Sequence, residues 1–92
     1  MIRRVELSRR ALKDLARVPR HVREKLQEWV EGVKQLGLEE MRKVRGYHDE
    51  PLKGPRTGQR SIRLSLAYRA IYVVTGDAVE FVRVEEVNKH AY

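Results

Sequence analysis

The chain has 92 residues, of which 41% are hydrophobic and 36% charged, and 20 Lys and Arg against 13 Asp and Glu residues give it a net charge of +7. A chain of this length builds one small core, so we expect residues 1–92 to form a single domain. The absence of cysteine excludes disulfides, thiolate metal sites and a cysteine nucleophile. The sequence has no long apolar run and no apolar N-terminal signal, and we therefore expect a cytoplasmic protein.

The positive charge is concentrated in the first two thirds of the chain. Residues 1–60 hold 16 basic and 9 acidic side chains, whereas residues 61–92 hold 4 of each. Most of the basic residues are arginines, whose planar guanidinium groups match phosphate oxygens. This composition favours a polyanionic partner, and a merely solvated basic surface is the alternative.

The first part of the chain predicts a strand followed by two helices. The opening IRRVEL is typical of a short strand, and Ser8 suits a helix N-cap because its hydroxyl can accept from a free backbone amide. Apolar residues within 7–16 predict a helix of about ten residues that ends before Pro19. Because the connection at Pro19 is short, we expect this helix and the next one to form an antiparallel hairpin. The second helix ends near Gly37 and has an apolar stripe formed by Val22, Leu26, Trp29, Val30, Val33 and Leu36.

The second part of the chain predicts a loop and then strands. Residues 38–60 carry few apolar side chains and are typical of a long basic loop, with one helical turn near residues 38–44. Two later strands, YRAIYVV and AVEFVRVEEV, flank a turn at Thr75-Gly76-Asp77, and the closing NKHAY is a tail or a helical turn. Before them, polar and apolar residues alternate from Ser61 onward, which predicts a strand whose core face is formed by Ile62, Leu64 and Leu66.

Helices that pack on one face of a mainly antiparallel sheet give the α+β class and leave the other face open. Arg63 alternates with the apolar residues of its strand and is therefore expected on the open face. Arg69 lies inside an apolar run, where a charge is costly unless it reaches a partner or a solvent-lined cleft. An internal salt bridge to Glu80 or Glu85 and an anion-binding role are both compatible with this position.

Further polar residues of catalytic type lie before and after the strands. His48, Glu50 and Lys53 precede the alternating strand, and His90 and Tyr92 close the chain. With the arginines they supply what RNA cleavage requires: a base for the 2′-hydroxyl, cations for the phosphorane and an acid for the leaving oxygen. Because the nucleophile belongs to the substrate, this reaction needs no cofactor, and the histidines lack the spacing of a zinc-binding helix.

The run EPLKGPRTGQRSIRLSLAYRAIYVV, followed by a strand and a terminal HAY, resembles the RelE/ParE superfamily of toxins from type II toxin–antitoxin systems. The resemblance covers nearly the whole chain and implies the RelE-like fold, with a helical hairpin packed on one face of the sheet. Its RelE-like branch comprises messenger-RNA endonucleases that act on the ribosome. Its ParE-like branch inhibits DNA gyrase and has no nuclease activity. The residues are most similar to the RelE/YoeB-like mRNA interferases.

The resemblance implies a role for each candidate catalytic residue. Glu50 would be the general base, and Arg63 and Arg69 would stabilise the charged phosphorane. His90 or Tyr92 would protonate the leaving oxygen. In this sequence Ala91 separates these two residues, whereas the enzymes that it resembles have an adjacent His-Tyr pair.

The resemblance also implies partners. The messenger RNA and the ribosome, at the 16S rRNA of the A site, would contact the basic loop, and a separate acidic antitoxin chain would neutralise the toxin. A gyrase inhibitor and an RNA-binding module without turnover are the alternatives. Convergence of the catalytic candidates on one cleft distinguishes the nuclease from both. The candidate RNA-binding residues are Arg42, Lys43, Arg45, His48, Lys53, Arg56 and Arg60.

Overall fold

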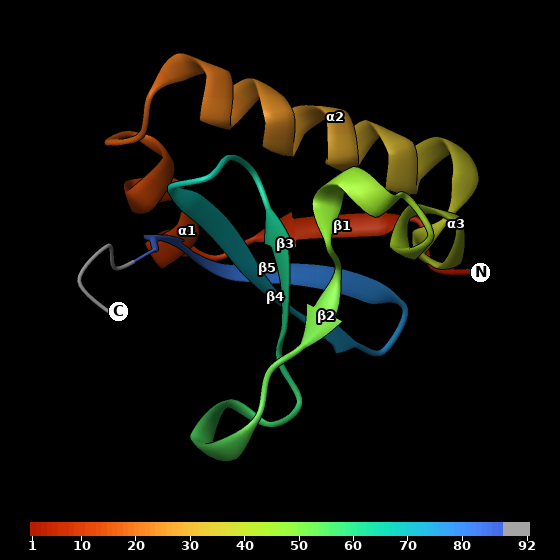
Figure 1. Cartoon of the computed structure of the whole chain (residues 1–92). Helices are drawn as coiled ribbons and strands as arrows, with labels where there is room; N and C mark the ends of the chain where they lie inside the picture. The colour runs from red at the N-terminus through yellow and green to blue at the C-terminus, as the bar shows by residue number, and fades with distance from the viewer. Residues whose placement is uncertain (88–92) are drawn as a thin grey trace.

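Three helices pack on a five-stranded, mainly antiparallel sheet, which confirms the α+β class (Figure 1). A computed structural model describes residues 1–87 of the chain. The elements are β1 (Arg4–Leu7), α1 (Arg9–Leu15), α2 (Arg20–Leu36), α3 (Leu38–Arg42), the 3₁₀ helix η1 (Arg45–Tyr47), β2 (Glu50–Pro51), the 3₁₀ helix η2 (Gly54–Arg56), β3 (Arg60–Arg63), β4 (Tyr68–Thr75) and β5 (Ala78–Glu86).

The strands lie in the order β1-β5-β4-β3-β2. The last three strands in sequence form an antiparallel meander, and its β4–β5 turn contains Gly76, as the sequence predicts. β1 is the exception, because it pairs in parallel with β5, from Arg4 opposite Ala78 to Leu7 opposite Phe81. The first and last strands of the described chain are therefore neighbours, a pairing that no local sequence pattern indicates.

The two N-terminal helices begin where the sequence predicts. The Ser8 hydroxyl accepts a hydrogen bond from the Ala11 amide at 3.0 Å, which confirms Ser8 as the N-cap of α1. α1 has only seven residues and is shorter than expected. The chain leaves the helix early because Val18 precedes a proline, which disfavours helical backbone, and Val18 is instead buried in the core. Arg23 of α2 donates to the Val18 carbonyl at 2.7 Å and ties the two helices together.

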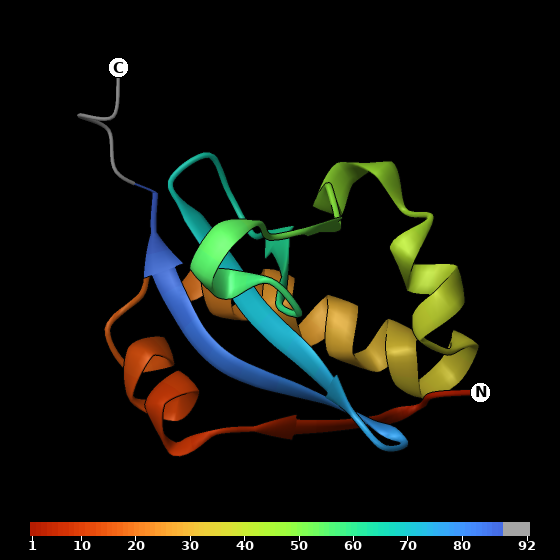
Figure 2. The same cartoon turned by 90° about the horizontal axis from the view of Figure 1, so that it is seen from below.

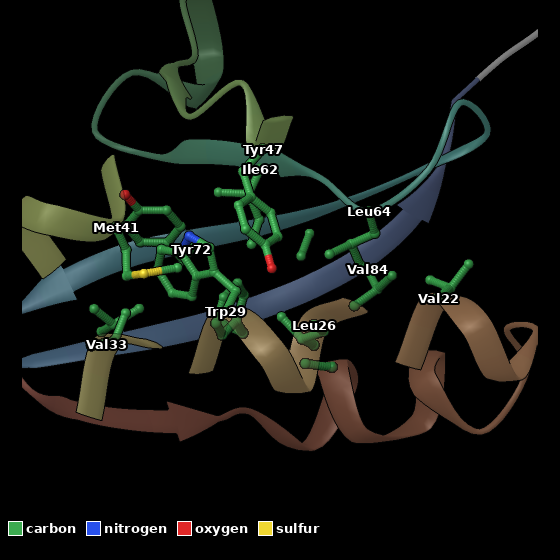
Figure 3. Close-up of a cluster of buried hydrophobic side chains, with 14 of the residues drawn as sticks. Val22, Leu26, Trp29, Val33, Met41, Tyr47, Ile62, Leu64, Tyr72 and Val84 are labelled. Carbon is green, nitrogen blue, oxygen red and sulfur yellow. The ribbon is translucent and has the colours of Figure 1, made fainter. Parts of the chain in front are cut away.

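The core lies between α2 and the sheet (Figure 3). Most of the predicted stripe of α2 faces the strands, and the Trp29 ring lies 5.3 Å from the Tyr72 ring and 5.4 Å from the Phe81 ring, measured between centroids. These tilted and edge-on contacts are favourable aromatic geometries. Leu36 does not join the core as expected, because it lies at the end of the helix with 55% of its surface exposed.

Two further expectations are corrected by the structure. Leu66 is 91% exposed rather than packed under the helices, because β3 ends at Arg63 and the Ser65 hydroxyl accepts from the Ala67 and Tyr68 amides in a turn. The segment 38–60 is more ordered than a loop. It contributes α3, the two 3₁₀ helices and the short strand β2, and three of its side chains, Leu38, Met41 and Tyr47, are buried in the core.

The helices cover one face of the sheet, whereas η2 lies on the other side (Figure 2). Ile62, Ala70 and Val84 point to the helices and are buried. The residues that alternate with them therefore face the side on which η2 lies. Within residues 1–87 no helix has the length and apolar character needed to span a membrane.

We predict that Gly37→Ala lowers the free energy of unfolding by about 1–3 kcal/mol, because Gly37 has a backbone conformation (φ 93°, ψ 158°) that side chains with a Cβ strongly disfavour. An added Cβ would also lie 2.8 Å from Met1 Cγ. Urea unfolding followed by Trp29 fluorescence measures the change. Gly46→Ala is the matched control, since a Cβ added there would have no neighbour within 4 Å and the φ of Gly46 is not positive. Equal stability of the two variants would contradict this account of the α2–α3 junction.

Candidate active site

A pocket of about 150 Å³ opens on the face of the sheet opposite the helices. It brings together three of the five predicted catalytic residues, Glu50, Arg63 and Arg69, although they come from three different strands. The remaining two, His90 and Tyr92, lie outside the described residues. The full lining of the pocket consists of His48, Glu50, Ser61, Arg63, Tyr68, Arg69 and Val87.

Strand register sets the positions of the charged side chains. Arg63 of β3 pairs with Arg69 of β4, and Arg69 pairs with Glu85 of β5, so the three side chains form a row across the open face. Glu50 pairs with Ser61, two residues before Arg63, and so enters the same face from the edge of the sheet. The alternation in the sequence thus predicts the placement of Arg63 correctly.

The position of Arg69 agrees with both expectations from the sequence, an internal salt bridge and a place in an anion-binding cleft. Its guanidinium contacts Glu85 Oε2 through Nη2 at 2.6 Å and Nε at 2.8 Å, which is the internal salt bridge, and it also lines the pocket. A second guanidinium reaches the same oxygen, because η2 folds back and places Arg56 Nη1 at 3.1 Å from Glu85 Oε2. On the other carboxylate oxygen, Arg83 Nη1 lies 3.7 Å from Glu85 Oε1.

These contacts change the acidity of the groups. Burial alone would raise the pKa of Glu85, but hydrogen bonds from Arg56 and Arg69 outweigh burial and hold the pKa below its ordinary value. The hydrogen bond to Glu85 raises the pKa of Arg56 in turn. Glu85 is therefore an ionised carboxylate at neutral pH that partly neutralises a group of arginines.

Behind the pocket lies a buried polar network centred on Asp49, which the sequence does not predict. The Asp49 side chain is 0% exposed and accepts hydrogen bonds from Arg60 Nε at 2.7 Å and from the Tyr72 hydroxyl at 2.6 Å. Burial and the hydrogen bond to Asp49 raise the pKa of Tyr72 to about 12. Arg42 Nε lies 3.4 Å from the same hydroxyl. No periodicity marks Asp49 in a polar segment, so only the folded contacts reveal it.

The backbone around Asp49 directs neighbouring side chains to opposite sides. His48 has the left-handed conformation (φ 47°, ψ 50°), which is unusual for a residue with a Cβ and typical of functional sites. After this bend Asp49 points into the protein and Glu50 lies exposed at the start of β2 and lines the pocket. The buried carboxylate thus anchors the residue immediately before the candidate base.

The predicted RNA-binding residues fall into two groups. Arg42 and Arg60 are half-buried and directed to Tyr72 and Asp49, and Arg56 is directed to Glu85. The others are exposed, and of these only His48 lines the pocket, while Lys43 pairs with Glu40 at 3.0 Å. The remaining exposed members of the predicted set are Arg45 and Lys53. In the described part of the chain, no three His, Cys, Asp or Glu side chains gather as metal ligands would.

Comparisons with known proteins identify relatives over most of the chain. Residues 5–88 match the family model described as the ParE toxin of the type II toxin-antitoxin system, parDE. Curated protein sequences give no significant match. Solved structures match in fold at identities too low to transfer a function.

Three such structures illustrate the likeness. YafQ from E. coli strain BL21(DE3) has 21% identity and a TM-score of 0.72 over 89% of this chain and 90% of its own. The YoeB/ParE toxin from Agrobacterium tumefaciens has 20% identity and a TM-score of 0.71 over 92% and 99%. The RelB-RelE antitoxin-toxin complex from Methanococcus jannaschii gives 23% identity and 0.72 over 88% of each chain.

We predict that Asp49→Asn destabilises the fold by about 2 kcal/mol, because it removes the charge from a buried hydrogen-bonded pair with Arg60. Asp77→Asn is the matched control, since its ion pair with Arg4 is exposed and such pairs contribute less than about 1 kcal/mol. Urea unfolding of both variants measures the difference. A cost for Asp49→Asn no larger than that of the control would show that the network does not anchor the segment.

We also predict a pH-dependent contribution from Glu85. Because its pKa is lowered on folding, the ion pairs stabilise the protein above the ordinary pKa of 4.5, and this contribution is lost as pH falls through the lowered value. Glu85→Gln should therefore be less stable than the parent near neutral pH, by about 1 kcal/mol for partly exposed pairs, and the difference should shrink in acid. Thermal unfolding of the parent and of Glu85→Gln, measured from neutral pH into acid, tests this prediction. A difference that stays constant into acid would contradict the assignment.

Proposed function

The chain belongs to the family of ParE toxins of type II toxin–antitoxin systems, within the RelE/ParE superfamily, and we propose that it is a ribosome-dependent messenger-RNA endonuclease. The observation that carries this proposal is the gathering of Glu50, Arg63 and Arg69 around one pocket. A carboxylate beside two guanidinium groups supplies a base and a phosphate site. A protein that only binds a partner has no need of that combination.

The charge state of the pocket supports a role in chemistry. Among residues 1–87 neither Glu50 nor Arg63 forms an ion pair, and both face the pocket, so each is available to a substrate. Two guanidinium groups placed opposite each other in register repel, which is unfavourable for stability alone. Such an arrangement becomes favourable when a phosphate lies between or above the two groups.

The proposed reaction is an in-line transfer within the RNA. Glu50 accepts the proton of the 2′-hydroxyl while that oxygen attacks the adjacent phosphorus. Arg63 and Arg69 stabilise the negative charge that builds on the phosphorane oxygens. The bond from phosphorus to the 5′-oxygen breaks, and His90 or Tyr92 donates a proton to that oxygen. The products are a 2′,3′-cyclic phosphate and a 5′-hydroxyl end.

The proposal includes two kinds of partner. Exposed basic residues outside the pocket, among them Arg45 and Lys53, would contact the phosphates of ribosomal RNA at the A site. A cognate antitoxin would neutralise the toxin, as in the solved antitoxin-toxin complex from Methanococcus jannaschii that shares the fold. The net charge of +7 favours an acidic antitoxin.

One observation favours a second candidate function. The family model that matches is that of the ParE toxins, and the ParE-like branch is the one that the sequence resemblance associates with inhibition of DNA gyrase. A gyrase inhibitor needs no base, and Glu50 would then be dispensable. The two functions therefore differ in what they require of the pocket.

We predict that Arg63→Ala and Glu50→Gln each slow RNA cleavage by about a hundredfold or more, because they remove a charge stabiliser and the base. Primer extension on a reporter message in a bacterial translation extract measures the breaks. Both side chains are exposed, so the fold should survive these changes. Arg20→Ala is the control, because that arginine is 84% exposed at the start of α2.

Two results would overturn the nuclease assignment. Breaks of equal intensity with Glu50→Gln would remove Glu50 from the chemistry. Growth arrest without any breaks, together with loss of DNA supercoiling by gyrase in the presence of either the parent or Glu50→Gln, would instead establish the gyrase inhibitor.

A further inference from the structure

Glu85 is surrounded by arginines from three separate elements. Arg56 comes from η2, Arg69 from β4 and Arg83 from β5 itself, and all three guanidinium groups lie within 4 Å of the Glu85 carboxylate. Oε2 alone accepts from Arg56 and Arg69. This is the coordination expected of a bound anion, although the anion belongs to the protein's own chain.

The position of this cluster connects it to the candidate active site. Arg69 lines the pocket, and it stands between Arg63 on one neighbouring strand and Glu85 on the other. The Glu85 side chain keeps 21% of its surface exposed and those of Arg56 and Arg69 keep 36% and 34%, so solvent and a ligand can reach all three. The carboxylate is therefore not sealed in the core.

We propose that Glu85 occupies, in the RNA-free protein, a phosphate-binding position between Arg56 and Arg69, and that an RNA phosphodiester displaces it on binding. A phosphodiester and a carboxylate each carry one negative charge shared by two equivalent oxygens, so either can satisfy the same pair of guanidinium groups. The inference rests on the proposed function, because it takes RNA as the ligand of the pocket.

The exchange has a physical rationale. Without an anion, Arg56, Arg69 and Arg63 would repel one another, and Glu85 relieves this repulsion in the free protein. The same carboxylate competes with RNA, because each phosphate contact requires breaking an existing ion pair. Glu85 thus stabilises the arginine cluster and at the same time lowers the affinity for RNA.

The test measures binding of an RNA that cannot be cut because its 2′-hydroxyls are methylated. Fluorescence anisotropy would compare the parent with Glu85→Gln and with Glu86→Gln, which removes the same charge from an exposed neighbour outside the cluster. We expect Glu85→Gln to bind about fivefold more tightly than the parent, and Glu86→Gln to show only a smaller effect of net charge. In a Glu85→Gln, Arg56→Ala double variant the gain should disappear.

A second variant guards against loss of the fold. Glu85→Asp keeps the net charge but shortens the side chain, so it reaches Arg56 and Arg69 less well and should also bind RNA more tightly than the parent. Circular dichroism at the assay temperature verifies that each variant is folded.

The outcomes separate the inference from the proposed function. If the parent binds the RNA and Glu85→Gln binds no more tightly than Glu86→Gln, the inference falls and the proposed function stands. Weaker binding by Glu85→Gln would likewise overturn it, because Glu85 would then orient the arginines for RNA. If neither the parent nor Glu85→Gln binds, the inference falls, because no phosphodiester displaces Glu85, whereas the proposed function is decided by the primer-extension assay with ribosomes.

Discussion

The candidate site depends on one buried carboxylate. Asp49 is enclosed by Arg60 of β3 and Tyr72 of β4, two residues that face each other in the sheet, and it joins the preceding segment to both strands at once. A buried charge is tolerated only with such partners, so the segment can dock in essentially one way. Glu50 is the next residue in the chain, so the fixed position of Asp49 also places Glu50 at the pocket.

Local patterns in the sequence predict most of the fold. Ser8 caps α1, Gly37 ends α2, and the alternation through Arg63 gives the direction of the open face. Periodicity does not tell where a strand stops, and Leu66 therefore lies in a turn that the Ser65 hydroxyl stabilises. The sequence likewise does not show which distant strands pair. β1 and β2 are short, and packing rather than their own composition selects their partners.

In the site, too, some features follow from the sequence and others do not. Strand alternation points to Arg63 and a charge inside an apolar run points to Arg69, whereas Glu50 is singled out as a base by the family resemblance. None of these signals assigns partners to these charges. Glu85 serves two arginines and Asp49 serves Arg60 and Tyr72, and both sets are built from residues far apart in sequence. The composition therefore does not distinguish a structural arginine such as Arg60, which pairs with Asp49, from one that is available to bind RNA.

The parallel pairing of β1 with β5 has a consequence for synthesis of the protein. β5 contributes Val79, Phe81 and Val84 to the core, and the backbone amide of Ser8, at the start of α1, donates to the Phe81 carbonyl at 2.9 Å. The N-terminal strand, although made first, can therefore pair in the sheet only once the last described strand is available. A nascent chain that still lacks β5 has neither a closed core nor the Glu85 partner of Arg69, so the arginine cluster assembles only after β5 has been made.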